Sequence, residues 1–256
     1  MIRASLKLIG FIVVTLCLVP LQLCVLCVTK GANAYIIPRL WHRAVCRISG
    51  LRFRIIGTPV ASQVIYVANH LSYLDIPVLG ASLMASFVAK SEVAGWPIFG
   101  FLSKIQQTAF ISRKATDAAR VSQSLGAMVA EGKSLIIFPE GTSTTGESVL
   151  PFRSSLFNLL DERGEPYALP IQPVTLVLKT VNGHPDNRLG YAWVGDMVLA
   201  PHLWDFWKGT GAEIDLIFHP LITTTSESDR KELAQRAQKM VAEGLARDLA
   251  TSPANV

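Results

Sequence analysis

The chain has 256 residues, enough for one sizeable α/β domain and a small additional element. Hydrophobic residues make up 50% of it and charged residues only 17%, so it is more apolar than an ordinary soluble enzyme. The formal net charge of +5 favours an anionic partner, either nucleic acid or an anionic lipid surface. Because the basic residues do not form arms with interleaved aromatics, and no nucleic-acid-binding module is recognisable, the lipid surface is the better interpretation.

The apolar excess is concentrated near the start of the chain. Between residues 8 and 28 only Thr15 and Gln22 are polar, so the run has about the 20 residues that a helix needs to cross a bilayer. Pro20 can kink such a helix, which leaves a re-entrant or steeply tilted segment as an alternative. We expect a retained N-terminal membrane anchor.

A cleaved signal peptide is the rival interpretation of this run. Arg3 and Lys7 precede the run, and residues 32–34 have the small side chains of a cleavage site. The run is, however, longer than the usual hydrophobic region of about 7–15 residues. Basic residues are more numerous after the run than before it, which predicts that the rest of the chain faces the cytoplasm. They are Lys30, Arg39, Arg43, Arg47, Arg52 and Arg54.

Strand-like and helical runs alternate after the anchor, which favours an α/β sheet with helices packed on it. Residues 34–49 form an expected helix whose aromatic and basic side chains suit a membrane interface. Strands are expected at 51–56, 64–68, 86–89, 108–111, 134–138, 174–178, 191–194 and 214–218. Further helices are expected at 74–84, 115–131 and 227–249. We therefore divide the chain into an anchor with its interfacial helix, residues 1–49, and one domain, residues 50–256.

A histidine and an aspartate follow the expected strand at 64–68. His70 precedes Asp75 by five positions in the stretch Asn69-His70-Leu71-Ser72-Tyr73-Leu74-Asp75. Histidine is the usual base for a hydroxyl that attacks an acyl carbonyl near neutral pH, and an aspartate at its other ring nitrogen fixes the tautomer. Because the two positions lie on different faces of a regular helix, the histidine should lie in the turn before the helix. The alternative is a capping histidine and an aspartate near the helix dipole.

A second motif, Phe138-Pro139-Glu140-Gly141-Thr142, ends the expected strand at 134–138. Ligands of α/β sheets gather at the carboxyl ends of strands. Pro139 and Gly141 favour a turn that exposes Glu140, and Gly141 lets a substrate approach the backbone. The alternative is an ordinary turn with a solvated glutamate.

Together the two motifs resemble the 1-acylglycerol-3-phosphate acyltransferase family of lysophospholipid acyltransferases. The signature of that family is Asn-His, four residues and Asp, followed later by Phe-Pro-Glu-Gly-Thr. Two further blocks of the family are matched in the right order, so the likeness covers about residues 50–180. They are Lys90, Glu92, Pro97 and Gly100 leading into Phe110-Ile111-Ser112-Arg113, and Pro170-Ile171-Gln172-Pro173-Val174.

The resemblance implies an acyltransferase domain with a mixed sheet flanked by helices, preceded by an N-terminal hydrophobic helix or two-helix membrane element. His70 would take the proton of a lysolipid hydroxyl as it attacks a fatty acyl thioester, and Asp75 would orient His70. The donor would be an acyl-carrier protein or coenzyme A thioester, with no cofactor or metal, and the location would be the bacterial inner membrane. The remaining residues that we assign to substrate binding are Asn69, Ser72, Lys90, Arg113, Glu140, Gly141, Thr142 and Arg153.

The acceptor expected from the resemblance is 1-acylglycerol 3-phosphate, which would give phosphatidic acid in phospholipid synthesis. Two departures bear on that expectation: Ser143 stands where many relatives carry arginine, and Phe152-Arg153-Ser154-Ser155 stands where they have Lys-Xaa-Gly. Both fall where a phosphate could be held, so lyso-ornithine lipid, which lacks a phosphate, is the alternative acceptor. Arg113 and Arg153 are the arginines that could hold a phosphate instead. A non-catalytic membrane lipid-binding protein is the alternative from another class.

Overall fold

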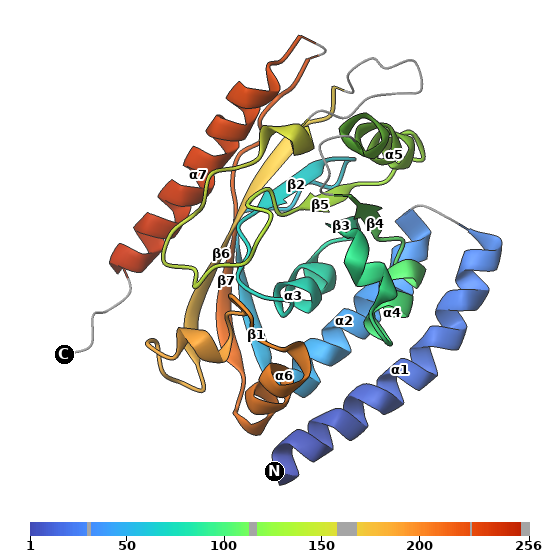
Figure 1. The fold of residues 1–256 in the computed structure, drawn as a ribbon, viewed down its shortest axis with the longest axis vertical. Helices are drawn as coiled ribbons and strands as arrows, with labels where there is room; N and C mark the ends of the chain where they lie inside the picture. The colour runs from blue at the N-terminus through green and yellow to red at the C-terminus, as the bar shows by residue number, and fades with distance from the viewer. Residues whose placement is uncertain (30–31, 113–116, 158–167, 226, 252–256) are drawn as a thin grey trace.

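The computed structural model describes residues 1–29, 32–112, 117–157, 168–225 and 227–251. Its centre is a seven-stranded sheet with the strand order β1-β7-β6-β2-β5-β3-β4 (Figure 1). Neighbouring strands from β6 to β4 are parallel, β7 is antiparallel to β6, and β1 is parallel to β7. The mixed sheet that the family resemblance implies is therefore confirmed. The strands are β1 (Leu51–Ile56), β2 (Ile65–Ala68), β3 (Ser86–Lys90), β4 (Ala109–Ile111), β5 (Leu135–Ile137), β6 (Ile171–Val181) and β7 (Ala212–Phe218).

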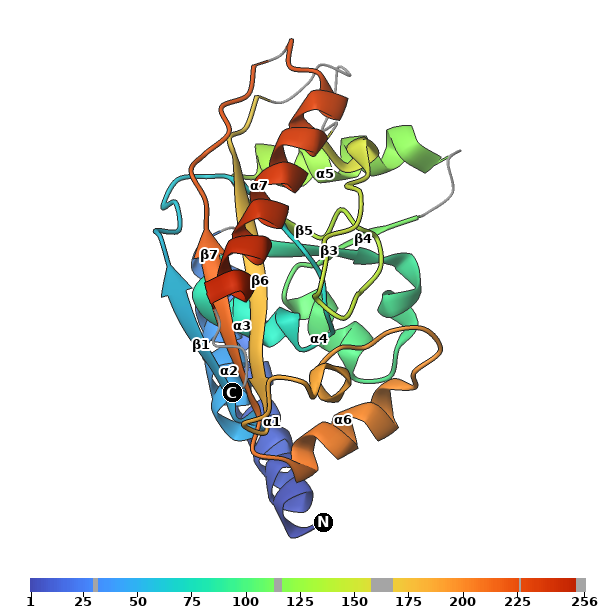
Figure 2. The ribbon, with the colours of Figure 1, turned by 90° about the vertical axis from the view of Figure 1, so that its left-hand side faces the viewer.

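Helices cover both faces of the sheet (Figures 1 and 2). Tyr66 and Ala68 of β2 join an apolar core with α2, α3 and α6, whereas Ile65 and Val67 join a second core with α5 and α7. A strand that is buried on both faces is typical of parallel sheets covered by helices. The helices are α1 (Ile2–Val28), α2 (Ile36–Ser49), α3 (Asp75–Ser82), α4 (Phe99–Ile105), α5 (Ala118–Ala130), α6 (Leu199–Lys208) and α7 (Arg230–Thr251). Short 3₁₀ turns lie at Ala32–Tyr35, Ser91–Gly95, Ser154–Phe157 and Arg188–Gly190.

The N-terminal helix α1 packs along α2 and α6 (Figure 1). Ala4 and Phe11 on its inner side are part of the core that contains α2 and α6. Lys7 Nζ donates hydrogen bonds to the carbonyl oxygens of Ser49 and Gly209, at 2.9 and 3.0 Å, where α2 and α6 end. These contacts fix the N-terminal part of α1 against the ends of α2 and α6.

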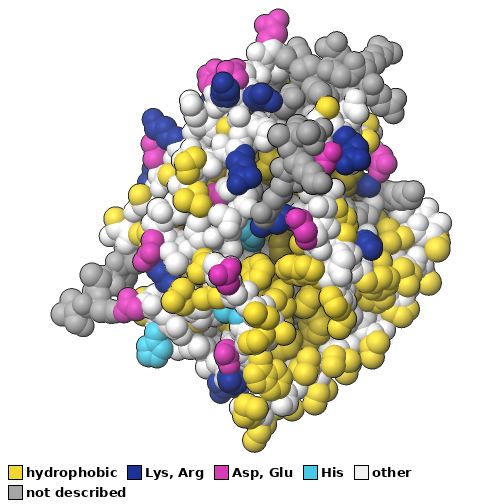
Figure 3. All heavy atoms as spheres, in the orientation of Figure 1, with side chains coloured by type: hydrophobic (Ala, Val, Ile, Leu, Met, Phe, Trp, Pro, Cys, Tyr) yellow, Lys and Arg dark blue, Asp and Glu magenta, His cyan; other side chains and the backbone are white. Residues whose placement is uncertain are grey.

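The outer side of α1 is apolar. Figure 3 shows hydrophobic side chains gathered along α1 and over the neighbouring α4, while most charged side chains on this face lie elsewhere. Within the described residues, α1 is the one helix whose length and composition would allow it to cross a membrane, although a signal sequence would pass the same test. The exposed side chains include Leu6, Ile9, Ile12, Val13 and Leu16.

Most expected elements are present, with boundaries shifted by a few residues. The helix expected at 227–249 is present as α7, which packs on β6 and buries Ala237, Val241 and Leu245. Helices α4 and α6 were not expected from the sequence. The strand expected at 191–194 was wrong, because this stretch follows a 3₁₀ turn and runs without strand pairing.

Candidate active site

The two sequence motifs meet at one edge of the sheet. The strands β2 and β5 are parallel neighbours, with Val67 opposite Ile137. His70 and Glu140, each three residues further along, therefore leave the sheet side by side. The His70 amide donates a hydrogen bond to Glu140 Oε1 at 2.8 Å.

His70 and Asp75 form a close pair at this edge. His70 Nδ1 lies 2.8 Å from Asp75 Oδ2. As the spacing predicts, the histidine lies in the turn before α3, and Asp75 is the first residue of that helix. The imidazole stacks on the Phe138 ring with centroids 4.1 Å apart, and the side chain is 21% exposed.

The hydrogen bond to Asp75 decides what the imidazole can do. With the Nδ1 proton directed at the carboxylate, the lone pair is on Nε2, and no hydrogen bond within the described residues occupies that atom. A neutral imidazole held in this way can take a proton from a hydroxyl and later return it to a leaving group.

Asp75 is fixed by the protein from several sides. Its side chain is completely buried, and a buried carboxylate needs hydrogen-bond donors to offset its lost hydration. The amides of Leu71 and Ser72 donate to Oδ2 at 2.7 and 3.0 Å, and the Tyr191 hydroxyl donates to Oδ1 at 2.8 Å. The carboxylate is therefore oriented before any substrate binds.

Tyr191 is the residue of this site that sequence reasoning missed. Burial raises the pKa of Tyr191 well above its usual value, so that its hydroxyl stays protonated and can donate. The backbone beside it is held by the first motif and the loop after the second: Trp193 N donates to Leu71 O at 2.9 Å, and the Ser143 hydroxyl donates to Trp193 O. These contacts take the place of the strand pairing expected for 191–194.

We predict that Tyr191→Phe lowers kcat by about 5- to 30-fold, because the loss of a hydrogen bond to a buried charged group costs on the order of 1–2 kcal/mol. Steady-state kinetics at saturating substrates would measure this effect. The matched control is Tyr66→Phe, which removes another tyrosine hydrogen bond, from Tyr66 Oη to Val60 O, away from Asp75. Equal losses in the two variants would contradict a specific role for Tyr191.

Glu140 joins the two motifs. Its side chain is 3% exposed, and both oxygens accept backbone hydrogen bonds, Oε1 from His70 N and Oε2 from Leu150 N, each at 2.8 Å. Burial raises the pKa of Glu140, and the two backbone hydrogen bonds act in the opposite direction. In this structure the carboxylate holds the turn that contains His70.

Two further residues of the first motif are also engaged inside the protein. The Asn69 side chain exchanges two hydrogen bonds with the backbone of Leu176 in β6, at 3.0 and 2.8 Å. Ser72 Oγ accepts a hydrogen bond from Leu74 N at 3.3 Å. Asn69 and Ser72 are both completely buried, so their polar atoms support the turn between β2 and α3.

The other predicted site residues differ in their positions. The Arg153 side chain lies over Gly141, whose φ is +70° and where an added Cβ would be 2.9 Å from Arg153 Nε. Thr142 is exposed in the same loop. Lys90 ends β3 at the same edge of the sheet, with β5 between β3 and β2. Arg113 lies outside the described residues.

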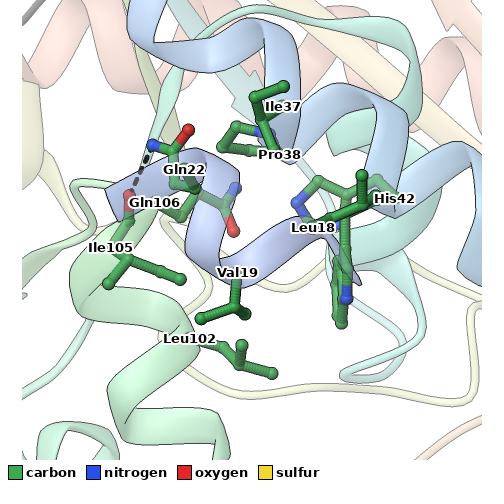
Figure 4. A pocket seen from close by; sticks show the side chains of 10 residues that line it. Leu18, Val19, Gln22, Ile37, Pro38, His42, Leu102, Ile105 and Gln106 are labelled. Carbon is green, nitrogen blue, oxygen red and sulfur yellow. Dashed lines mark hydrogen bonds between the residues drawn. The ribbon is translucent and has the colours of Figure 1, made fainter. Parts of the chain in front are cut away.

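A separate pocket lies between α1, α2 and α4 (Figure 4). Its volume is about 330 Å³, including space that is open to solvent. Most of the side chains that line it are apolar, and the polar ones are Gln22, His42 and Gln106. Gln22 Oε1 and both ring nitrogens of His42 are buried without a hydrogen-bond partner in the described part of the chain. Burial lowers the pKa of His42 to about 4, so this ring is neutral at pH 7. Neither His70 nor Asp75 lines this pocket.

Comparisons with known proteins identify relatives of the chain. A sequence model of the Acyltransferase family matches residues 52–177. The chain is 32% identical over 247 residues to a lyso-ornithine lipid O-acyltransferase of Rhizobium meliloti, covering 91% of this chain and 84% of the relative. It is 27% identical over 190 residues to a 1-acyl-sn-glycerol-3-phosphate acyltransferase of Neisseria gonorrhoeae, covering 73% of this chain and 72% of the relative.

A solved structure shares the fold. The 1-acyl-sn-glycerophosphate acyltransferase PlsC from Thermotoga maritima superposes with a TM-score of 0.68 at 17% identity, covering 99% of this chain and 98% of that chain. The similarity in fold extends over the N-terminal helices as well as the sheet. The chain belongs to the 1-acylglycerol-3-phosphate acyltransferase family of lysophospholipid acyltransferases and is an acyltransferase.

Proposed function

We propose that the protein transfers a fatty acyl chain from an acyl thioester to the free hydroxyl of a lysolipid. The observation that carries this proposal is the 2.8 Å contact between His70 Nδ1 and Asp75 Oδ2, which directs the lone pair of Nε2 away from the carboxylate. The thioester would come from acyl-carrier protein or coenzyme A, and the chemistry requires no cofactor beyond it.

In the proposed reaction, His70 Nε2 takes the hydroxyl proton while the hydroxyl oxygen attacks the thioester carbonyl. A C–O bond forms, and the tetrahedral intermediate then collapses as the C–S bond breaks. The leaving sulfur receives the proton from Nε2, so the histidine ends the cycle neutral. The negative charge of Asp75 stabilises the imidazolium between these two proton transfers.

We place lyso-ornithine lipid first among the acceptors, the reverse of the order expected from the sequence. The relative from Rhizobium meliloti with this named activity is 32% identical to the chain over 91% of its length. In addition, Ser143 replaces the arginine of many relatives, and its hydroxyl is engaged by the backbone of Trp193. This position therefore offers no positive charge to a phosphate.

The second candidate acceptor is 1-acylglycerol 3-phosphate, with phosphatidic acid as the product. The position of Arg153 over Gly141 favours it, because a guanidinium beside the second motif can bind a phosphate in a bidentate way. The relative from Neisseria gonorrhoeae with this named activity is 27% identical to the chain.

A side-by-side assay would test the proposal. Purified protein is given each acceptor with acyl-carrier protein and coenzyme A thioesters of the same chain length, and free thiol and lipid product are measured. We expect acceptor-dependent thiol release, with the higher kcat/KM for lyso-ornithine lipid. Lipid binding without thiol release for any pair would instead indicate the non-catalytic lipid-binding protein.

Within this proposal, Asn69, Ser72 and Glu140 position His70 and Asp75 and do not contact the substrate directly. Their hydrogen bonds to backbone groups inside the protein support this assignment. Gly141 and Thr142 remain proposed contacts of the acceptor, because Thr142 is exposed and Gly141 lies beside the Arg153 side chain. Lys90 and Arg113 also remain proposed substrate-binding residues.

We propose that α1 holds the protein on the bacterial inner membrane, with the catalytic part on the cytoplasmic side. The prediction is that the full-length protein stays in the membrane fraction after a wash with about 1 M salt, because salt screens charge attraction but leaves the apolar contact intact. Immunoblots of pellet and supernatant would measure this. Recovery in the high-salt supernatant, or a mature N-terminus near residue 35, would contradict the anchor.

A further inference from the structure

Two arginines flank the loop that follows the second motif. We propose that Arg188 and Arg153 form an oxyanion-binding subsite for the acceptor headgroup, on either side of the 141–146 loop. This inference rests on the proposed acyl transfer and identifies the group that would hold the acceptor in place of the arginine that Ser143 replaces. Arg188 belongs to none of the four sequence blocks that carry the family resemblance.

Arg188 is brought to the site by the same segment that supplies Tyr191. The carbonyl oxygen of Arg188 accepts hydrogen bonds from Tyr191 N at 3.0 Å and Ala192 N at 2.8 Å. Arg188 is therefore fixed relative to the tyrosine that donates to Asp75. A Cβ added at Gly146 would lie 3.7 Å from Arg188 Nη1 and 2.5 Å from Leu71 Cδ2, so the guanidinium lies beside the loop close to the first motif.

Arg153 lies at the other end of the same loop. An added Cβ at Gly141 would be 2.9 Å from Arg153 Nε and 3.0 Å from its Cζ. The backbone of Arg153 is held in place by a hydrogen bond from its N to Pro139 O at 3.0 Å. A side chain in place of either glycine of the loop would crowd an arginine or Leu71.

The middle of the 141–146 loop is hydrogen-bonded to the backbone of His70. Thr144 N donates a hydrogen bond to His70 O at 2.9 Å, and Gly146 N donates to Thr144 Oγ1 at 3.2 Å. The loop that lies beside both arginine side chains is thus hydrogen-bonded to the backbone of His70. A headgroup bound between the arginines would be placed beside the histidine that activates the acceptor hydroxyl.

Neither guanidinium is neutralised in the part of the chain that the structure describes. No ion pair with a carboxylate involves Arg153 or Arg188 there. Arg188 Nη1 is buried and has no hydrogen-bond partner among the described residues. A buried charged donor without a partner is unfavourable, and an oxyanion is the partner that matches the guanidinium geometry.

The ligand class that follows is an oxyanion on a lysolipid headgroup. Lysophosphatidic acid offers a phosphate close to its free hydroxyl, and an ornithine headgroup offers a carboxylate. The same two arginines could bind either group, because phosphate and carboxylate both accept bidentate guanidinium hydrogen bonds. An uncharged monoacylglycerol has the free hydroxyl but lacks the anionic group. A variant that weakens only the binding of the headgroup should therefore lose activity with the anionic lysolipids and keep it with monoacylglycerol.

The test compares Arg188→Met and Arg188→Lys with the wild type on lysophosphatidic acid, lyso-ornithine lipid and monoacylglycerol. The matched control is Arg120→Met, since the Arg120 side chain in α5 is 78% exposed and forms an ion pair with Asp117, three residues away. For the anionic acceptor that the enzyme uses, we expect kcat/KM to fall at least about tenfold in Arg188→Met and less in Arg188→Lys. With monoacylglycerol the change should stay within about threefold, and the KM of the thioester should not change. If Arg188→Met does not fold, as judged by its thermal unfolding, Arg188→Lys and the double variant with Arg153→Lys provide the comparison.

Binding to the inactive His70→Ala protein makes the test independent of turnover. Micellar lysophosphatidic acid and lyso-ornithine lipid are titrated into His70→Ala with and without Arg188→Met, and we expect at least about tenfold weaker binding of the anionic lipid in the double variant. Equal losses on charged and uncharged acceptors, an altered thioester KM, or unchanged binding would overturn the subsite. A wild-type protein that binds the lipids through Arg188 but releases no thiol would overturn the proposed function and leave the subsite standing.

Discussion

Replacing His70 with alanine is expected to lower kcat/KM by at least about a hundredfold, the low end of what a general base contributes. The side chain supplies the only imidazole beside Asp75 in the described structure, and its Nε2 faces away from that carboxylate. The change also removes the ring that stacks on Phe138 at 4.1 Å. Because the backbone hydrogen bond from His70 N to Glu140 does not depend on the side chain, the turn should persist.

The measurement is thiol release under steady-state conditions, together with a thermal unfolding curve for each protein. The matched control is His184→Ala, because His184 is exposed in the turn after β6 and its backbone exchanges hydrogen bonds with Val181. We expect the control to retain activity within about twofold and both variants to unfold close to the wild-type temperature. Activity of His70→Ala within a few-fold of wild type would remove the general-base assignment.

The sheet edge and the His70–Asp75 pair could be predicted because short-range patterns determine them. The apolar stretch before His70 is typical of a central strand, and β2 is indeed buried on both faces of the sheet. The strand β5 before Glu140 is likewise apolar and buried on both faces. Parallel neighbours place their carboxyl ends together, which is why two motifs about 70 residues apart in the chain meet at 2.8 Å. The spacing of five residues also predicted correctly that His70 precedes the helix that Asp75 begins.

Tyr191 and Arg188 could not be predicted, because their positions depend on the tertiary course of the chain after β6. The hydrogen bond from Tyr191 to Asp75 joins residues 116 positions apart. The local sequence around Tyr191 is apolar and aromatic, which is typical of a strand. In the structure the Tyr191 side chain contacts the turn between β2 and α3 from outside the sheet. The hydrogen bonds of the Trp193 backbone with Leu71 and Ser143 take the place of pairing with a neighbouring strand.

The helices α4 and α6 were missed for a related reason. The stretch that contains α4 is rich in glycine and proline, which favour turns, but its first turn packs on the 3₁₀ segment before it. Helix α6 has Pro201 near its start, where a proline is tolerated because the first helical amides need no partner. Both helices are stabilised by packing against α1, whose place in the fold the sequence does not specify.

The Asp75→Asn variant is expected to lower kcat/KM by roughly 10²- to 10⁴-fold while the fold is retained. The asparagine carbonyl can occupy the position of Oδ2 and accept the three hydrogen bonds from His70 Nδ1, Leu71 N and Ser72 N. Its amide group would then face the Tyr191 hydroxyl, which can rotate to accept a hydrogen bond where it now donates one. What the substitution removes is the negative charge that stabilises the imidazolium during proton transfer.

A comparison of Asp75→Asn with Asp75→Ala separates the effect of the charge of Asp75 from the effect of its hydrogen-bond geometry. The alanine variant leaves two buried amides and the Tyr191 hydroxyl without an acceptor, which costs on the order of 1–3 kcal/mol for each group, so it should also lower the unfolding temperature. Asparagine should affect the unfolding temperature much less, and combining it with Tyr191→Phe should add little further loss of activity, because the tyrosine acts through the carboxylate. Thermal unfolding and kcat/KM for the two single variants and the double variant measure both effects. A fully active Asp75→Asn enzyme would show that the charge of Asp75 is not used, and would assign the residue a purely structural role.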